Sequence, residues 1–139
     1  MSRAIFFFFA ALCIGCATTQ PYGAFVVSSD KDASIMAEDA VGQLCAVYPP
    51  AKTALKIENK VEDPTGKALI RELRHKGFEV YQGVAPEDKA PLPTYYVLDQ
   101  LGKDTWRLTI GIGKRQLSRP YHIAQGALVV AAGSWTYKE

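Results

Sequence analysis

An apolar run near the start of the sequence, Ile5 to Leu12, limits how much of the chain can fold into a domain. The run is eight residues long, whereas a helix that crosses a bilayer needs about 20 mostly apolar residues. Arg3 precedes the run, and small or polar residues follow it at Ala17-Thr18-Thr19-Gln20. This order is typical of an export signal that is removed, and not of a permanent membrane span.

Cys16 ends this signal and indicates lipid attachment. The residues before it, Cys13-Ile14-Gly15, are similar to a lipobox, in which a branched apolar residue, a small or apolar residue and Gly or Ala precede a cysteine. Cys13 departs from the Leu that is usual at its position. The modification needs a thiol because the diacylglycerol is attached as a thioether. We therefore predict a lipoprotein signal peptide over 1–15, lipid attachment at Cys16 and a lipidated, flexible tether over 16–30.

Other interpretations of the same cysteine fit less well. An ordinary secretory signal needs a small-x-small cleavage site, and Ala10-Ala11-Leu12 is a poor one. A redox or metal pair of Cys13 and Cys16 would have to survive processing, and the sequence has no second pair to complete a zinc site. Ala17 follows Cys16, whereas Asp at that position usually retains a lipoprotein at the inner membrane. We therefore expect an outer-membrane protein that faces the periplasm, held by acyl chains.

The composition after processing is that of one nearly neutral domain. Removal of 1–15 leaves 124 residues (139 − 15), enough for a single core. Without Arg3 the net charge falls from +2 to +1, which argues against direct binding of nucleic acid. Only Cys45 then remains, so the fold needs packing and not an internal disulfide. We expect Cys45 to be a buried inert thiol, with an intermolecular bridge as the alternative.

Periodicity predicts two amphipathic helices. The first runs from Lys31 to Tyr48, begins at a Ser29 or Asp30 cap and ends at Pro49-Pro50. The second begins at Pro64 after an Asp63 cap and ends before Gly77. The predicted buried stripes are Met36, Ala40, Val41, Leu44 and Val47 on the first helix and Leu69, Ile70 and Leu73 on the second.

Strand patterns surround the second helix and fill the last third of the chain. Short strands over 53–58 and 78–81 flank that helix as a βαβ-like unit, and a proline-rich loop over 82–93 follows. Further strands are predicted over 94–101, 105–112, 116–123 and 128–137, the first two joined as a hairpin. We therefore predict an α+β fold for 31–139, in which two helices pack on a mixed β-sheet that continues as antiparallel strands.

Two details of this prediction concern the ends of the domain. The β-prone patch from Ala24 to Val27 could pair with a sheet edge, either its own or a partner's. The apolar run from Leu128 to Ala132 predicts a strand covered on both faces, with Trp135 inside against the helices.

No catalytic arrangement emerges from the sequence. Gly111-Ile112-Gly113-Lys114 lacks the glycine spacing of phosphate-binding and dinucleotide-binding loops. His75 and His122 have no partners at metal-ligand spacing. The remaining polar candidates are expected to be solvated: the pairs Glu38/Asp39 and Glu87/Asp88, and the basic cluster of Lys114, Arg115 and Arg119. We expect no catalytic, cofactor-binding or metal site, and no enzyme.

A small-ligand site is suggested only by aromatic residues, namely Tyr95, Tyr96, Trp106 and Trp135. Such residues are more typical of sheet core.

Several segments of the chain resemble the conjugal transfer protein TrbH family. They are Met36-Ala37-Glu38-Asp39-Ala40-Val41-Gly42-Gln43-Leu44, Tyr48-Pro49-Pro50-Ala51-Lys52-Thr53, Asp63-x-x-Gly66-x-x-Leu69-x-x-x-Leu73-Arg74-x-x-Gly77-Phe78-x-Val80, Leu117-Ser118-Arg119-x-Tyr121 and Gly133-Ser134-Trp135-Thr136-Tyr137-Lys138-Glu139. Cys16 matches the family's lipid-attachment cysteine. The resemblance implies a non-enzymatic lipoprotein of the mating-pair-formation (type IV secretion) apparatus. Its implied partners are the membrane, through the lipid, and TrbG-like and TrbI-like channel proteins. An envelope lipoprotein with a small-ligand-binding or wall-hydrolase role is the alternative.

Overall fold

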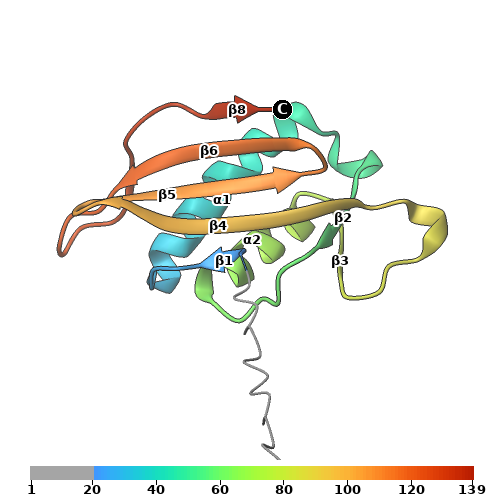
Figure 1. The fold of residues 1–139 in the computed structure, drawn as a ribbon, viewed down its shortest axis with the longest axis horizontal. Helices are drawn as coiled ribbons and strands as arrows, with labels where there is room; N and C mark the ends of the chain where they lie inside the picture. Colours follow the sequence, from blue (N-terminus) through green and yellow to red (C-terminus); the bar gives the residue numbers. More distant parts are fainter. Residues whose placement is uncertain (1–20) are drawn as a thin grey trace, which may run out of the picture.

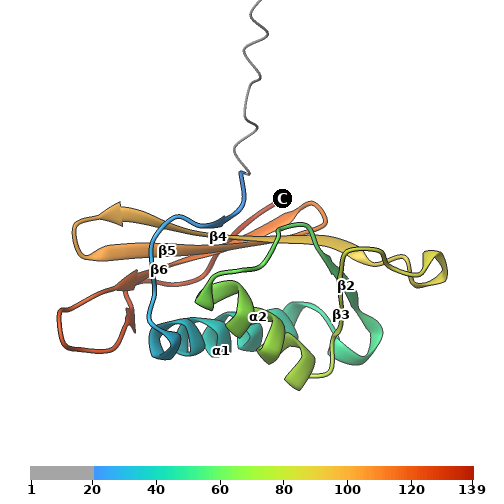
Figure 2. The same cartoon turned by 90° about the horizontal axis from the view of Figure 1, so that it is seen from below.

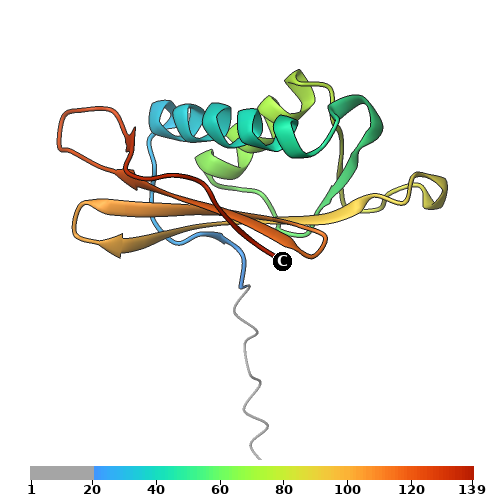
Figure 3. The same ribbon diagram turned by 90° about the horizontal axis from the view of Figure 1, so that it is seen from above.

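Two helices cover one face of a single mixed β-sheet (Figure 1). This computed structural model describes residues 21–139; the predicted signal over 1–15 and Cys16 lie outside the described residues. Helix α1 spans Asp30–Val47 and helix α2 spans Pro64–His75. Seen along the sheet, both helices lie on the same side, and the other side of the sheet is left open (Figures 2 and 3). The predicted α+β class is confirmed.

The sheet order is β3-β2-β4-β5-β6-β7. Strands β2 (Ala54–Ile57) and β3 (Glu79–Gln82) pair in parallel on either side of α2 in the sequence, and β2 also pairs in parallel with β4 (Leu92–Gly102). Strands β5 (Thr105–Ile112) and β6 (Arg115–His122) continue antiparallel from β4. The βαβ-like unit followed by antiparallel strands is therefore confirmed.

Three shorter strands, β1 (Gly23–Ala24), β7 (Val130–Ala131) and β8 (Thr136–Lys138), pair at the margins of the sheet. Two 3-10 turns lie at Pro50–Lys52 and Glu87–Lys89.

Local capping signals explain where the helices begin and end. The Ser29 hydroxyl accepts the Asp32 N–H at 3.1 Å at the start of α1. The Asp63 carboxylate accepts the Gly66 N–H at 2.9 Å at the start of α2, and Pro64 takes the first helical position. Gly77, with φ +99°, ends that helix in a conformation that favours glycine. Both helices thus begin and end within one or two residues of the sequence prediction.

The core lies between the helices and one face of the sheet. Alternate residues of β4 and β5 point toward the helices, and β6 contributes its odd-numbered residues. The largest fully buried side chains of this layer are Met36, Val41, Leu44, Leu55, Leu98, Leu108, Ile112, Leu117 and Tyr121. Leu69, Ile70 and Leu73 complete it from α2, as their helical spacing predicted. Cys45 is half-buried at the margin of this core and its thiol is free.

The expected covered strand over Leu128 to Ala132 is wrong. Within that run only Val129 is buried, and β7 pairs with just Tyr121 and His122 at the edge of the sheet. Both helices already cover the face over the central strands, so no third layer exists to cover this run. Trp135 is half-buried beside β6 and packs against the hydrophobic core, so it is less enclosed than predicted but lies against the core as expected. The apolar composition of this run indicated burial, but composition does not tell which other layer of the fold would cover the run.

Pro120 explains why two short strands share the outer side of β6. Its carbonyl accepts the Ala132 N–H at 2.9 Å, so its ring nitrogen faces the same outer side and donates nothing there. Strand β7 pairs beyond this point and β8 pairs before it, at Gln116 to Ser118. Strand β6 therefore has an interrupted outer edge, as is typical of a strand that contains proline.

The β-prone patch near the N-terminus pairs with the protein's own sheet. Gly23 and Ala24 lie parallel to Val97 and Leu98, and the Phe25 N–H donates to the Leu98 carbonyl at 2.8 Å. The hydroxyls of Ser28 and Thr65 form a buried hydrogen bond of 2.9 Å that fixes the same segment to α2. Residues that the sequence analysis assigned to the tether therefore lie against the folded domain.

Gly66→Ala should destabilise the protein, whereas Gly42→Ala should not. A Cβ at Gly66 would overlap the Tyr96 hydroxyl and approach Val61 Cγ1 to 2.7 Å, and overpacking of this kind costs about 1–3 kcal/mol. A Cβ at Gly42, in the exposed face of α1, meets nothing within 4 Å, so Ala there should stabilise by about 0.4–1 kcal/mol. Urea unfolding followed by circular dichroism checks both changes. Equal stability of the two variants would contradict the close packing of Tyr96 on α2.

Candidate functional site

A polar cluster joins α1, β6 and the C-terminal segment. Arg119 Nη1 donates to both carboxylate oxygens of Asp39, at 2.8 and 2.9 Å, and the Tyr121 hydroxyl donates to Asp39 Oδ2 at 2.5 Å. Arg119 Nε also donates to the Gly133 carbonyl at 2.7 Å, and its guanidinium lies 5.8 Å from the centre of the Trp135 ring. We call these five residues the Asp39 cluster.

The Asp39 cluster brings together three segments of the TrbH resemblance that are far apart in the sequence. The sequence analysis expected Asp39 to be solvated and Arg119 to belong to a solvated turn, and both expectations are wrong. Their side chains are only 31% and 23% exposed, respectively. Burial, and then the hydrogen bond to Asp39, raise the pKa of Tyr121 well above its usual value, so this hydroxyl stays a donor. Asp39 and its two partners on β6 are 80 or more residues apart in the sequence, and such distant contacts produce no local sequence pattern.

A second carboxylate–tyrosine pair fixes α2 to the sheet. Asp63 caps α2 with one carboxylate oxygen and accepts the hydroxyl of Tyr96 on β4 with the other. Burial and this hydrogen bond raise the pKa of Tyr96 in the same way. Gly66 leaves room for the tyrosine ring against the first turn of the helix. Each helix is therefore attached to the sheet by one carboxylate, in addition to its apolar stripe.

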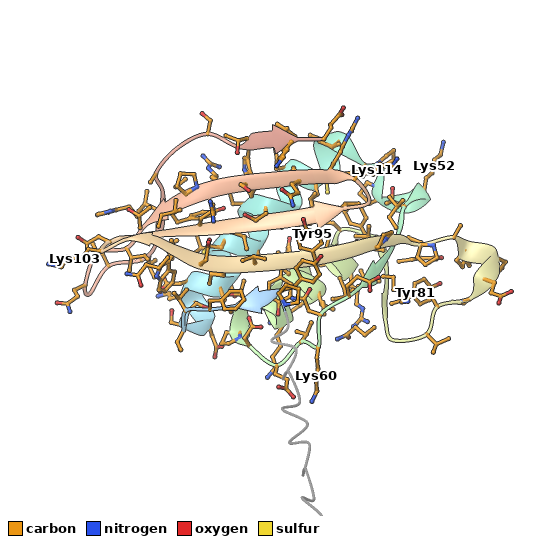
Figure 4. All side chains as sticks on the ribbon, in the orientation of Figure 1. Lys52, Lys60, Tyr81, Tyr95, Lys103 and Lys114 are labelled. Carbon is orange, nitrogen blue, oxygen red and sulfur yellow. The ribbon has the colours of Figure 1, made fainter. Side chains whose placement is uncertain are left out.

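The open face of the sheet holds the N-terminal segment by an aromatic stack. The rings of Tyr22 and Tyr95 lie 4.1 Å apart at 19°, in a stacked arrangement. Tyr95 in turn covers Gly111, where a Cβ would overlap its ring, and its hydroxyl accepts a hydrogen bond from Gln116. Figure 4 shows Tyr95 at the middle of the sheet. This stack fixes Tyr22 on the open face of the sheet.

The predicted candidates for chemistry do not converge. His75 lies exposed at the end of α2, and His122 lies exposed at the end of β6. Tyr95 and Tyr96 point to opposite faces of the sheet, so these two rings do not face a common site. Among residues 21–139, no three His, Cys, Asp or Glu side chains gather as a metal would require.

One face of α2 carries cations that no carboxylate neutralises. Lys67, Arg71 and Arg74 line a shallow groove together with Val61 and Ile70. None of these three cations forms an ion pair, although every Asp and Glu of the sequence lies in the described part of the chain. Arg71 donates to the Ser34 hydroxyl at 3.0 Å and Arg74 to the Val80 carbonyl at 3.2 Å, so both guanidinium groups are held in place. We call these three residues the cationic face.

The fold and these contacts define a class of protein: an α+β domain with helices on one face of the sheet, in which polar side chains from the resembling segments join helices to strands. Comparison with protein families identifies the family. The conjugal transfer protein TrbH family matches residues 19–139, and the chain belongs to this family. Comparison with curated proteins and with solved structures gives no match.

Asp39→Ala should cost about 1–3 kcal/mol of unfolding free energy, because it leaves the Tyr121 hydroxyl and the Arg119 guanidinium partly buried without their acceptor. Asp99→Ala is the matched control. It removes the partner of Arg107 on the open face, where the arginine is 42% exposed and water replaces the carboxylate, so the cost should stay below about 1 kcal/mol. Urea unfolding of the two purified variants measures the difference. If Asp99→Ala costs as much, the Asp39 cluster has no special structural role.

Proposed function

We propose that this chain is an outer-membrane lipoprotein that supports the conjugative type IV secretion apparatus from the periplasmic side, without catalysing a reaction. Membership of the conjugal transfer protein TrbH family over residues 19–139 carries this proposal. The sequence supports the anchor independently, because Arg3, the apolar run from Ile5 to Leu12 and Cys16 have the order of a lipoprotein signal.

No helix within residues 21–139 is long and apolar enough to span a bilayer. The position of Tyr22 supports attachment by lipid: its ring is stacked on Tyr95 of the folded domain and it lies six residues after Cys16, so acyl chains at Cys16 would hold the domain close to the membrane. Ala17, in place of Asp, favours the outer membrane as the final location.

A structural role accounts for the polar residues that the family resemblance emphasises. The carboxylates of Asp39 and Asp63 are both occupied by intramolecular donors. A wall hydrolase or a ligand-binding protein would need convergent free groups, and the proposed function requires none. We infer that the domain acts by contact, with TrbG-like and TrbI-like channel proteins as its partners.

The cationic face is the surface of α2 that we assign to such a contact. Its three cations are exposed and form no ion pair within the described chain, and an acidic segment of a channel protein would complement them. The half-buried Val61, which lines the same groove, would add apolar contact. No nucleic acid is required for this role.

Cys16→Ser should abolish acylation and impair conjugation, because the domain would lose its membrane anchor. Incorporation of radiolabelled palmitate and the transfer frequency of the complemented element measure the two effects. Cys13→Leu is the matched control: it removes the other cysteine of the signal and places there the Leu that is usual in a lipobox, so this variant should keep both the label and the transfer. Equal labelling of the wild type and the Cys16→Ser protein would remove the lipoprotein proposal.

Charge reversal of the cationic face by Lys67→Glu with Arg71→Glu should weaken co-purification of the channel proteins, with more loss at low salt than at high salt. The same reversal at Lys52 and Lys114, exposed lysines away from α2, serves as the control (Figure 4). Both proteins should keep the circular dichroism spectrum of the wild type. Unchanged co-purification of the α2 variant would place the partner contact elsewhere.

A further inference from the structure

Exposed apolar side chains concentrate at one end of the molecule. Five of the seven large apolar side chains that are exposed lie there: Phe25, Val27, Leu101, Leu128 and Val130. They belong to three segments, namely the link from β1 to α1, the β4–β5 hairpin tip and the stretch that leads into β7. Figure 4 marks this end by Lys103, opposite the end that carries Lys52 and Lys114. We call these five residues the apolar end.

Backbone contacts hold the three segments at the same end of the fold. Residue Phe25 bonds to Leu98 near the end of β4, and Thr105 pairs with His122, which pairs with Val130. The Val129 N–H donates to Asp32 Oδ1 at 3.0 Å, which attaches the stretch before β7 to the first turn of α1. Hydrogen bonds between the backbones of these segments and their neighbours therefore keep the five exposed apolar residues at one end of the domain.

We propose that the apolar end inserts into the surface of the lipid bilayer that carries the anchor, so that the domain is held at the membrane by two contacts. This inference rests on the proposed lipid attachment at Cys16. Exposed apolar side chains on separate loops suit an interfacial site, because a bilayer surface accepts them without a complementary shape.

The form of this end favours a bilayer over a protein partner. A protein interface places its apolar anchors in packed pockets. The hollow at this end is instead lined mainly by polar residues, including Lys103, Asp104, His122 and Gln125, and offers no apolar pocket that joins the exposed side chains. Lys31 and Lys103 face Asp30, Asp32 and Asp104 at this end, a net charge of −1 (2 − 3), so the contact rests on apolar insertion and not on attraction to anionic headgroups.

The length of chain before the described domain permits both contacts at once. Tyr22 lies six positions after Cys16 (22 − 16), and an extended chain of that length spans at most about 20 Å. Tyr22 is fixed on Tyr95, and Leu101 lies six residues further along β4, which is also about 20 Å in a strand. An acyl group on Cys16 therefore reaches the plane of the apolar end. Because the anchor already holds the domain at the surface, even weak apolar contacts would be occupied.

Lipid-borne nitroxide quenching tests this contact in the full, acylated chain. A fluorophore is attached at Val27→Cys, Leu128→Cys or Val84→Cys in a shared Cys45→Ser background, and each protein is reconstituted in phosphatidylethanolamine–phosphatidylglycerol vesicles that contain doxyl lipid. Val84 is the matched control, because it is 96% exposed, as Val27 is 90% exposed, but lies outside the apolar end. We expect quenching at 27 and 128 to exceed that at 84 by at least about twofold.

Hydrogen exchange of the wild-type chain in the same vesicles gives a second measurement without substitutions, and it should show slowed exchange over 100–105 and 124–130 but not over 83–89. Equal quenching at all three positions, in a sample that carries the palmitate label, overturns the membrane contact and leaves the anchor intact. A sample without the label overturns both proposals. Labels that stay in water in vesicles but become shielded when channel proteins are added would overturn the membrane contact and identify a protein interface.

Discussion

The carboxylate of Asp39 is the point on which the arrangement of the domain depends most. Asp39 joins α1 directly to β6, and its partner Arg119 extends the same set of polar contacts to the C-terminal segment. Asp63 joins α2 to β4 through Tyr96. Apolar stripes bring a helix to a sheet but tolerate sliding and rotation, whereas a partly buried carboxylate with fixed donors has one satisfied geometry. The two carboxylates therefore set the position of both helices on the sheet.

A consequence of this arrangement is that the sheet is covered on one face only. Its other face carries polar pairs, such as Thr109 with Ser118, and the stack of Tyr22 on Tyr95. That stack converts the open face into the site where the N-terminal segment is held. If Cys16 carries lipid and the apolar end inserts as proposed, the open face and the apolar end both lie near the bilayer, and α2 lies on the other side of the sheet (Figures 2 and 3). The two proposed contacts would then be separated on different sides of the domain.

The sequence predicted those parts of the fold that depend on neighbouring residues. Asp63-Pro64 and Pro49-Pro50 mark helix ends by local sterics and hydrogen bonds, and alternation in β5 identifies its buried face. The Asp39 cluster could not be predicted, because its residues meet only after β6 and α1 are placed. The run from Leu128 to Ala132 misled for a related reason: hydrophobicity reports a tendency to be buried, but the layer that could bury it is a property of the whole topology. Cys16 and the signal over 1–15 remain predictions.

Several residues that carry the family resemblance hold the elements of the fold together, and the proposed contact surfaces use few of the resembling residues. Asp39, Arg119 and Trp135 lie in the resembling segments and form contacts between elements of the fold. None of the five residues of the apolar end lies in those segments. Arg74 belongs both to the resemblance and to the cationic face. In such a domain, one set of residues stabilises the fold and a different set forms the proposed contacts with the membrane and with partner proteins. Substitutions at the apolar end should therefore change membrane contact without changing the unfolding free energy, while substitutions in the Asp39 cluster should do the reverse.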